Sequence, residues 1–224
     1  MDAPKARATE QGVIRNNMKD IEVIGNNYVQ GSYQLLPESA DRVRAALHFA
    51  ELCEKEANKN NEKTSRWYYR ASLSEYKSIF DVLKADFKNM GIAPIWKQSE
   101  FKETLSNNTL VTVLSKARDL AIHSASLKGN HKKKLWQYLG DSGETPVEQN
   151  SIFFDEIKKD MLNDNASYIT DKNIAWFNKQ SSQWPVFLLV REAIYQSSVP
   201  IANFLTVNHK RITMRSSGTR EKAS

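Results

Sequence analysis

Arginine, aspartate and histidine side chains lie close together in the segment from Lys116 to Ser124. Asp119 and His123 are four residues apart, so on a helix they share one face. A carboxylate at this spacing can accept a hydrogen bond from one imidazole nitrogen, which fixes the tautomer and raises the basicity of the ring. Arg118 precedes His123 by five residues, about 140° around a helix axis, and its long side chain can still flank a group that the histidine reaches.

These three side chains have the chemistry needed to cleave RNA without a metal ion. The histidine would take the proton from a ribose 2′-hydroxyl or give one to the leaving oxygen. The arginine would stabilise the charge that grows on the phosphate. Arg118, Asp119 and His123 are therefore our candidate catalytic residues.

A second candidate group consists of lysines that follow this segment. It contains Lys128 and the run Lys132, Lys133 and Lys134. Clustered lysines neutralise phosphates, so we expect these four residues to bind nucleic acid. The alternative is that the run forms an ordinary solvated face.

Composition sets few limits on the partner but excludes several kinds of site. The 224 residues include 32 basic and 26 acidic side chains, a net charge of +6, which permits a polyanionic partner without requiring one. A single cysteine, Cys53, excludes an intramolecular disulfide and a zinc site built from thiolates. The four histidines are scattered, and no glycine-rich phosphate-binding motif occurs. We therefore expect neither a metal nor a cofactor.

Hydropathy indicates where the protein acts. No run approaches the 18 apolar residues of a membrane-spanning helix, and the first residues lack the apolar core of a secretion signal. We expect a cytoplasmic protein that does not associate with a membrane.

Hydrophobic periodicity predicts a mainly helical chain that begins with an antiparallel pair of long helices. The first is expected over about 39–58, with Ser39 as its N-cap, and Asn58 to Asn61 closing it. The second is expected from Thr64 or Ser65 to Gly91, with Trp67 opening its buried stripe.

Further helices are expected along the rest of the chain. One opens at Ser99, the next covers about 109–127 and carries the candidate catalytic residues, a third is capped by Thr170 or Asp171, and the last covers 186–208. Residues 128–150 are predicted as loop and turn, and 152–162 as a short helix.

These expectations divide the chain into three parts. Residues 1–35 form a partly disordered, irregular arm that could include a small hairpin. Residues 36–209 form the helical domain, with a loop-rich segment at about 128–170. Residues 210–224 form a basic, disordered tail.

The pattern Arg118-Asp119-x-x-x-His123 resembles the Arg-polar-x-x-x-His motif of HEPN-domain proteins (higher eukaryotes and prokaryotes nucleotide-binding). The context is similar too, because a long helical hairpin precedes the helix that carries the motif. The resemblance covers about residues 37–127, with 172–208 as completing helices. It implies an all-α, antiparallel bundle of four to five core helices that forms a homodimer. In active members the two motifs face each other across a cleft that cleaves RNA without metal.

The resemblance leaves two functions open, since many relatives are inactive. The first is an endoribonuclease of toxin or phage-defence type, whose partners would be RNA and an antitoxin or other protein. The second is an inactive helical dimer that binds nucleotide, nucleic acid or a protein partner.

Overall fold

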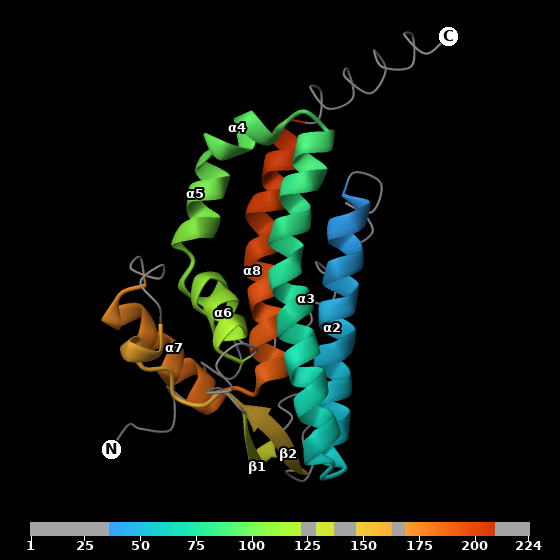
Figure 1. Cartoon of the computed structure of the whole chain (residues 1–224), viewed down its shortest axis with the longest axis vertical. Coiled ribbons are helices and arrows are strands. Elements are labelled where there is room, and N and C mark those ends of the chain that lie inside the picture. Colours follow the sequence, from blue (N-terminus) through green and yellow to red (C-terminus); the bar gives the residue numbers. More distant parts are fainter. Residues whose placement is uncertain (1–35, 122–128, 137–146, 163–168, 209–224) are drawn as a thin grey trace, which may run out of the picture.

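The computed structural model describes residues 36–121, 129–136, 147–162 and 169–208, and these residues are mainly helical (Figure 1). Three long helices run side by side, and a row of shorter helices returns along α8. The helices are α2 (Pro37–Asn58), α3 (Glu62–Asn89), α4 (Ala93–Lys97), α5 (Glu100–Asn107), α6 (Thr109–Asp119), α7 (Asp171–Gln183) and α8 (Val186–Val207).

The predicted hairpin of two long helices is confirmed. α2 ends at Asn58, and Asn60 takes a left-handed backbone conformation, with φ of 58°, that reverses the chain. Asn61 then caps α3 by accepting a hydrogen bond from the Thr64 amide. α3 starts at Glu62, slightly earlier than expected, and Gly91 follows its end with φ of 67°.

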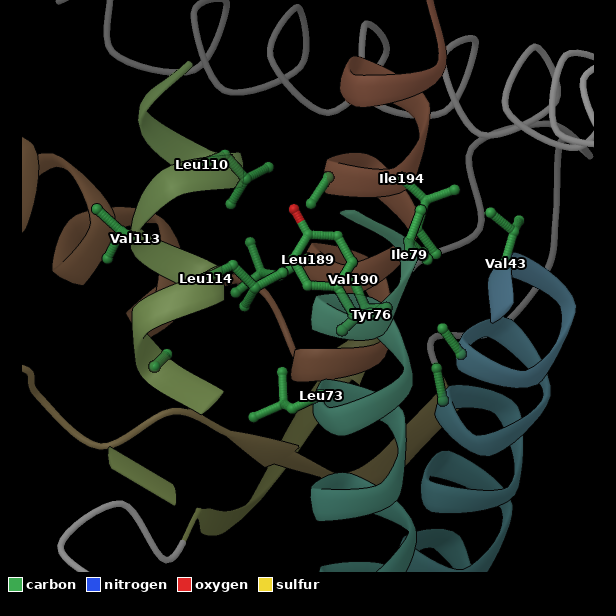
Figure 2. Close-up of a cluster of buried hydrophobic side chains, with 14 of the residues drawn as sticks. Val43, Leu73, Tyr76, Ile79, Leu110, Val113, Leu114, Leu189, Val190 and Ile194 are labelled. Carbon is green, nitrogen blue, oxygen red and sulfur yellow. The ribbon is translucent and has the colours of Figure 1, made fainter. Parts of the chain in front are cut away.

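The core lies where α2, α3, α6 and α8 meet. Figure 2 shows apolar side chains from all four helices filling this space. The labelled members are Val43, Leu73, Tyr76, Ile79, Leu110, Val113, Leu114, Leu189, Val190 and Ile194. The apolar side chains of the segment that starts at Thr109 are buried as far as Ala121. This packing fixes the rotation of α3 and α6 about their own axes.

The expected buried stripe of α3 is wrong at its first position. Trp67 is 58% exposed, whereas Tyr69 and Tyr76 are fully buried. Positions 67 and 69 are about 200° apart on a helix, so burial of the two tyrosines turns Trp67 toward solvent. Cys53 is buried on α2, and burial raises the pKa of its thiol.

Ser39 does not cap α2, contrary to expectation. The helix starts at Pro37, with Leu36 at the N-cap, because proline is favoured in a first helical turn. Ser39 is buried and donates from its amide (3.1 Å) and its hydroxyl (2.6 Å) to the Asp86 carboxylate. These bonds join the start of α2 to the end of α3.

The loop expected at 128–150 is in part a small antiparallel sheet. Strand β1 (Asn130–Trp136) pairs with β2 (Val147–Phe153), and His131 lies opposite Ile152. The short helix expected at 152–162 is wrong, since only the 3-10 turn η2 (Lys159–Met161) forms there. Ser151, Ile152 and Phe153 are all buried, so both faces of β2 are covered and the alternation that marks a strand is missing.

Other boundaries agree with the sequence to within a residue or two. Ser99 and Thr170 cap α5 and α7 as expected, whereas Asn108 rather than Thr109 caps α6. α8 continues through Pro200. α6 ends at Asp119, earlier than the expected residue 127. Residues 122–127 of that expected helix, the N-terminal arm with its hairpin, and the tail lie outside the described residues. No helix in the described ranges is long and apolar enough to cross a membrane.

We predict that Asp86→Ala destabilises the fold by about 3 kcal/mol, because it leaves two buried donors of Ser39 without an acceptor. The free energy of unfolding in urea measures this loss. Asp81→Ala, on the exposed side of α3, is the matched control and should change stability by less than about 0.5 kcal/mol. Equal losses in the two variants would contradict the structural role of Asp86.

Candidate functional site

Arg118 and Asp119 lie on the last turn of α6, at the edge of the core. The neighbouring face of α6, with Val113, Leu114 and Ala117, is fully buried. This burial leaves the side chains of Arg118 and Asp119 24% and 27% exposed. They are therefore half-buried groups that solvent or a ligand can still reach.

A lysine from α3 completes this group. One oxygen of Asp119, Oδ1, accepts from Lys77 Nζ at 2.5 Å and from Arg118 Nη1 at 3.0 Å. The Lys77 side chain is 33% exposed. We call Lys77, Arg118 and Asp119 the ion-pair cluster. It holds two cations against one anion, so its formal charge is +1 and it favours an anionic ligand.

Lys77 and Arg118 stabilise the ionised form of the Asp119 carboxyl. Burial by itself raises the pKa of the Asp119 carboxyl, but hydrogen bonds and charges from Lys77 and Arg118 outweigh it, and the pKa lies below its usual range. The carboxylate thus stays ionised at neutral pH and keeps both cations in place.

Sequence reasoning missed Lys77, because nothing local links it to a motif 42 residues further on. It also predicted that Asp119 would orient His123. His123 and Lys128 lie outside the described residues, so both roles remain predictions. In the structure, Asp119 binds the two cations of the cluster.

The other predicted lysines lie on β1, a different element from the ion-pair cluster. Lys134 donates to the backbone carbonyls of Ser182 (3.0 Å) and Gln183 (2.8 Å) at the end of α7. A cation there offsets the negative end of the helix dipole. Burial and the charge of Lys132 lower the pKa of Lys134. Both ammonium groups also lie over the Phe153 ring, at 5.5 Å for Lys132 and 4.6 Å for Lys134.

The third residue of the run, Lys133, is exposed on β1. Lys134 therefore holds the sheet to the bundle through its bonds to α7, whereas Lys133 lies at the surface. Binding of nucleic acid by these lysines remains a prediction.

His131, on strand β1, contacts the first turn of α3. Its Nε2 lies 3.2 Å from Ser65 Oγ, and that hydroxyl donates to the Glu62 carbonyl at 3.0 Å. Because the Ser65 hydroxyl hydrogen is used in that bond, the His131 ring donates from Nε2 to Ser65 Oγ. Burial is the main cause that lowers its pKa, and Arg66 adds to the effect while Glu62 opposes it. His131 fixes β1 against the start of α3.

A half-buried carboxyl holds the other strand to α2. Ser151 Oγ donates to Glu54 Oε1 at 2.6 Å. Burial raises the pKa of Glu54 to about 7, and the bond from Ser151 reduces this effect. No group of three His, Cys, Asp or Glu side chains within the described ranges could hold a metal ion.

Comparison with known proteins identifies no family for this chain. A scan against protein-family models, a search of curated proteins and a search of solved structures found no match to this chain.

Glu54 predicts a pH dependence of stability. Its pKa is about 7 in the folded protein against a usual value of 4.5, so its contribution is complete below about pH 4.5 and is lost as the pH rises through 7. We expect Glu54→Gln to remove about 2–3 kcal/mol of the change in unfolding free energy between pH 5 and pH 8.

Urea titrations of wild type and variant at several pH values measure this slope. Glu51→Gln, at an exposed position of the same helix, should keep the wild-type slope. Parallel pH profiles for Glu54→Gln and wild type would rule out the raised pKa.

Proposed function

We propose that this chain is a metal-independent endoribonuclease of HEPN type, acting inside the cell in a toxin or phage-defence setting. The observation that carries the proposal is the ion-pair cluster, in which one carboxylate oxygen holds Lys77 and Arg118 at the end of α6. Two half-buried cations in fixed positions, one of them the Arg118 that precedes His123 by five residues, suit a phosphate undergoing substitution.

The reaction is transfer of the phosphodiester within the RNA strand. The ribose 2′-oxygen attacks the neighbouring phosphorus, and the bond from phosphorus to the 5′-oxygen of the next nucleotide breaks. His123 accepts the 2′-hydroxyl proton or supplies the proton that the leaving 5′-oxygen takes up. Arg118 and Lys77 stabilise the extra negative charge on the phosphate oxygens. The products carry a 2′,3′-cyclic phosphate and a 5′-hydroxyl.

Two sites in a homodimer would supply both proton transfers. The base and the acid act on opposite sides of the phosphorus, and one histidine is in place for only one of them. A two-fold axis beside the ion-pair cluster would bring a second His123 to the other side. Asp119 would then also reduce the repulsion between the two arginines.

The order of elements supports the HEPN-like bundle. A long hairpin, α2 and α3, precedes the helix with the motif residues, and α8 completes the four-helix core. The β1–β2 sheet and α7 lie between the motif helix and α8 in sequence as an addition to this bundle.

Cleavage of RNA in EDTA tests the proposal. Purified wild type should cut RNA and leave 2′,3′-cyclic phosphate ends. His123→Ala should lose about 10²–10⁴-fold in rate, as expected for a general acid or base. Arg118→Ala should lose about 10²–10³-fold, as expected for a group that stabilises transition-state charge.

Matched controls are His48→Ala and Arg44→Ala, which replace exposed residues of α2 and should keep the wild-type rate. Thermal unfolding shows that each variant is folded. Intact RNA after incubation with concentrated wild type, across several substrates, would exclude the nuclease. RNA binding without cleavage would instead identify the inactive binding module.

A further inference from the structure

A stripe made of three basic side chains, a tryptophan and a serine runs along one face of α3. It consists of Lys63, Trp67, Arg70, Ser74 and Lys77, at alternating spacings of four and three residues. At 100° per residue these positions fall within about 80° of the helix circumference, and the stripe is about 21 Å long. We call it the α3 stripe. Trp67 lies on the side of α3 opposite Tyr69 and Tyr76, which the core buries, and the stripe turns toward the α6 side of the helix at Lys77.

The N-terminal part of the stripe is open to solvent. Trp67 is 58% exposed, and Lys63 and Arg70 are also exposed. Lys63 Nζ lies 5.3 Å from the centroid of the Trp67 ring. An exposed indole beside cations offers a flat surface for stacking together with charge for a phosphate, which is the combination found in proteins that bind single strands.

The charge of the stripe has one sign. Between Lys63 and Lys77 no carboxylate occupies the stripe positions, and the nearest acidic residues lie about 100° or more around the helix. Of these, Glu75 is bound by Arg42 of α2 at 2.9 Å. Lys63 and Arg70 therefore face solvent with no anion at the stripe positions between them, whereas Lys77, at the end of the stripe, is paired with Asp119. The two exposed cations complement a polyphosphate backbone.

The stripe ends at the candidate site. Lys77 belongs to both, because its ammonium meets Asp119 beside Arg118. The stripe is thus continuous with the ion-pair cluster.

We infer that a single-stranded segment of RNA binds along the α3 stripe, with one base stacked on Trp67 and its backbone leading past Arg70 to the ion-pair cluster. This inference rests on the proposed function, since cleavage at the cluster defines where the strand goes. About 21 Å has room for about four nucleotides, the lower end of the site sizes of sequence-independent binders.

The strand must be single, because Trp67 needs a base that is free of its neighbours to stack on. Stacking on Trp67 accepts any base, because every base has a π-face, so we expect little sequence preference at this surface.

The test measures binding apart from cleavage. The probe is a fluorescent 12-nucleotide RNA with 2′-O-methyl groups, which lacks the attacking hydroxyl and stays intact whether or not the protein is a nuclease. Fluorescence anisotropy gives the dissociation constant. We expect Trp67→Ala to weaken binding about tenfold and Trp67→Phe to restore most of it.

Charge gives a second readout. Arg70→Glu and Lys63→Glu should each weaken binding at least about fivefold and make the dependence on salt shallower. Lys55→Glu, with the same charge change at an exposed position of α2, should match wild type after correction for net charge. Arg70 and Lys63 are both exposed, and thermal unfolding verifies that each variant is folded.

Several results would overturn binding of RNA along the α3 stripe. A duplex of the same sequence that competes as well as the single strand would overturn it. So would equal binding by wild type and the Trp67 and Arg70 variants, or no binding by wild type. Cleavage of ordinary RNA by those variants at the wild-type rate would reject the stripe and leave the nuclease, whereas binding on the stripe with no cleavage would reject the nuclease alone.

Discussion

Tyr69, Leu73 and Tyr76 are fully buried on one face of α3, among α2, α6 and α8. Fully burying one such aromatic or leucine side chain contributes about 1.5–3 kcal/mol, so the helix cannot rotate about its axis without a large loss. The rotation in turn decides the position of every other α3 side chain. Lys77 is brought to the edge that meets α6, and Trp67 is turned outward. The ion-pair cluster and the α3 stripe both depend on this one packing constraint.

Polar contacts at the ends of the bundle fix the relative positions of the elements more than they add to the overall stability of the fold. Ser39 and Asp86 hold one end of the α2–α3 hairpin, and Glu54 with Ser151 holds β2 against α2 near the other. Buried and half-buried bonds of this kind are costly when one partner is lost, so they favour one arrangement of the elements. The sheet is thereby held to α2 while α6 stays packed on α3 and α8.

The helical part of the fold could be predicted because its signals are local. Hydrophobic periodicity, the Asn58–Asn61 turn, Gly91 and the Ser99 cap all act within a few residues of the element they shape. The β1–β2 sheet could not, since three consecutive residues of β2 are buried by helices distant in sequence. Ser39 was misassigned for a related reason, because its partner Asp86 is 47 residues away.

The candidate site shows the same division. Arg118 and Asp119 were found from spacing along one helix, and both lie at its partly exposed edge. Lys77 required the packing of α3 on α6 and had no signal near the motif. α3 has aromatic residues on two faces, one with Trp67 and one with Tyr69 and Tyr76. Periodicity alone predicts that the core buries the face with Trp67, but the structure buries the face with the two tyrosines. Local sequence patterns do not contain the packing between elements, so features that depend on this packing cannot be predicted from them.

Photo-crosslinking tests most directly whether RNA lies on α3 and leads to the ion-pair cluster. A 2′-O-methyl RNA containing 4-thiouridine is bound, irradiated and digested with trypsin, and mass spectrometry identifies the crosslinked peptides. Our account predicts crosslinks in the peptides 67–70 and 71–77 of α3 and in 119–128, which follows Arg118. Crosslinks confined to the lysine run of β1 or to α2, with none on α3, would contradict it.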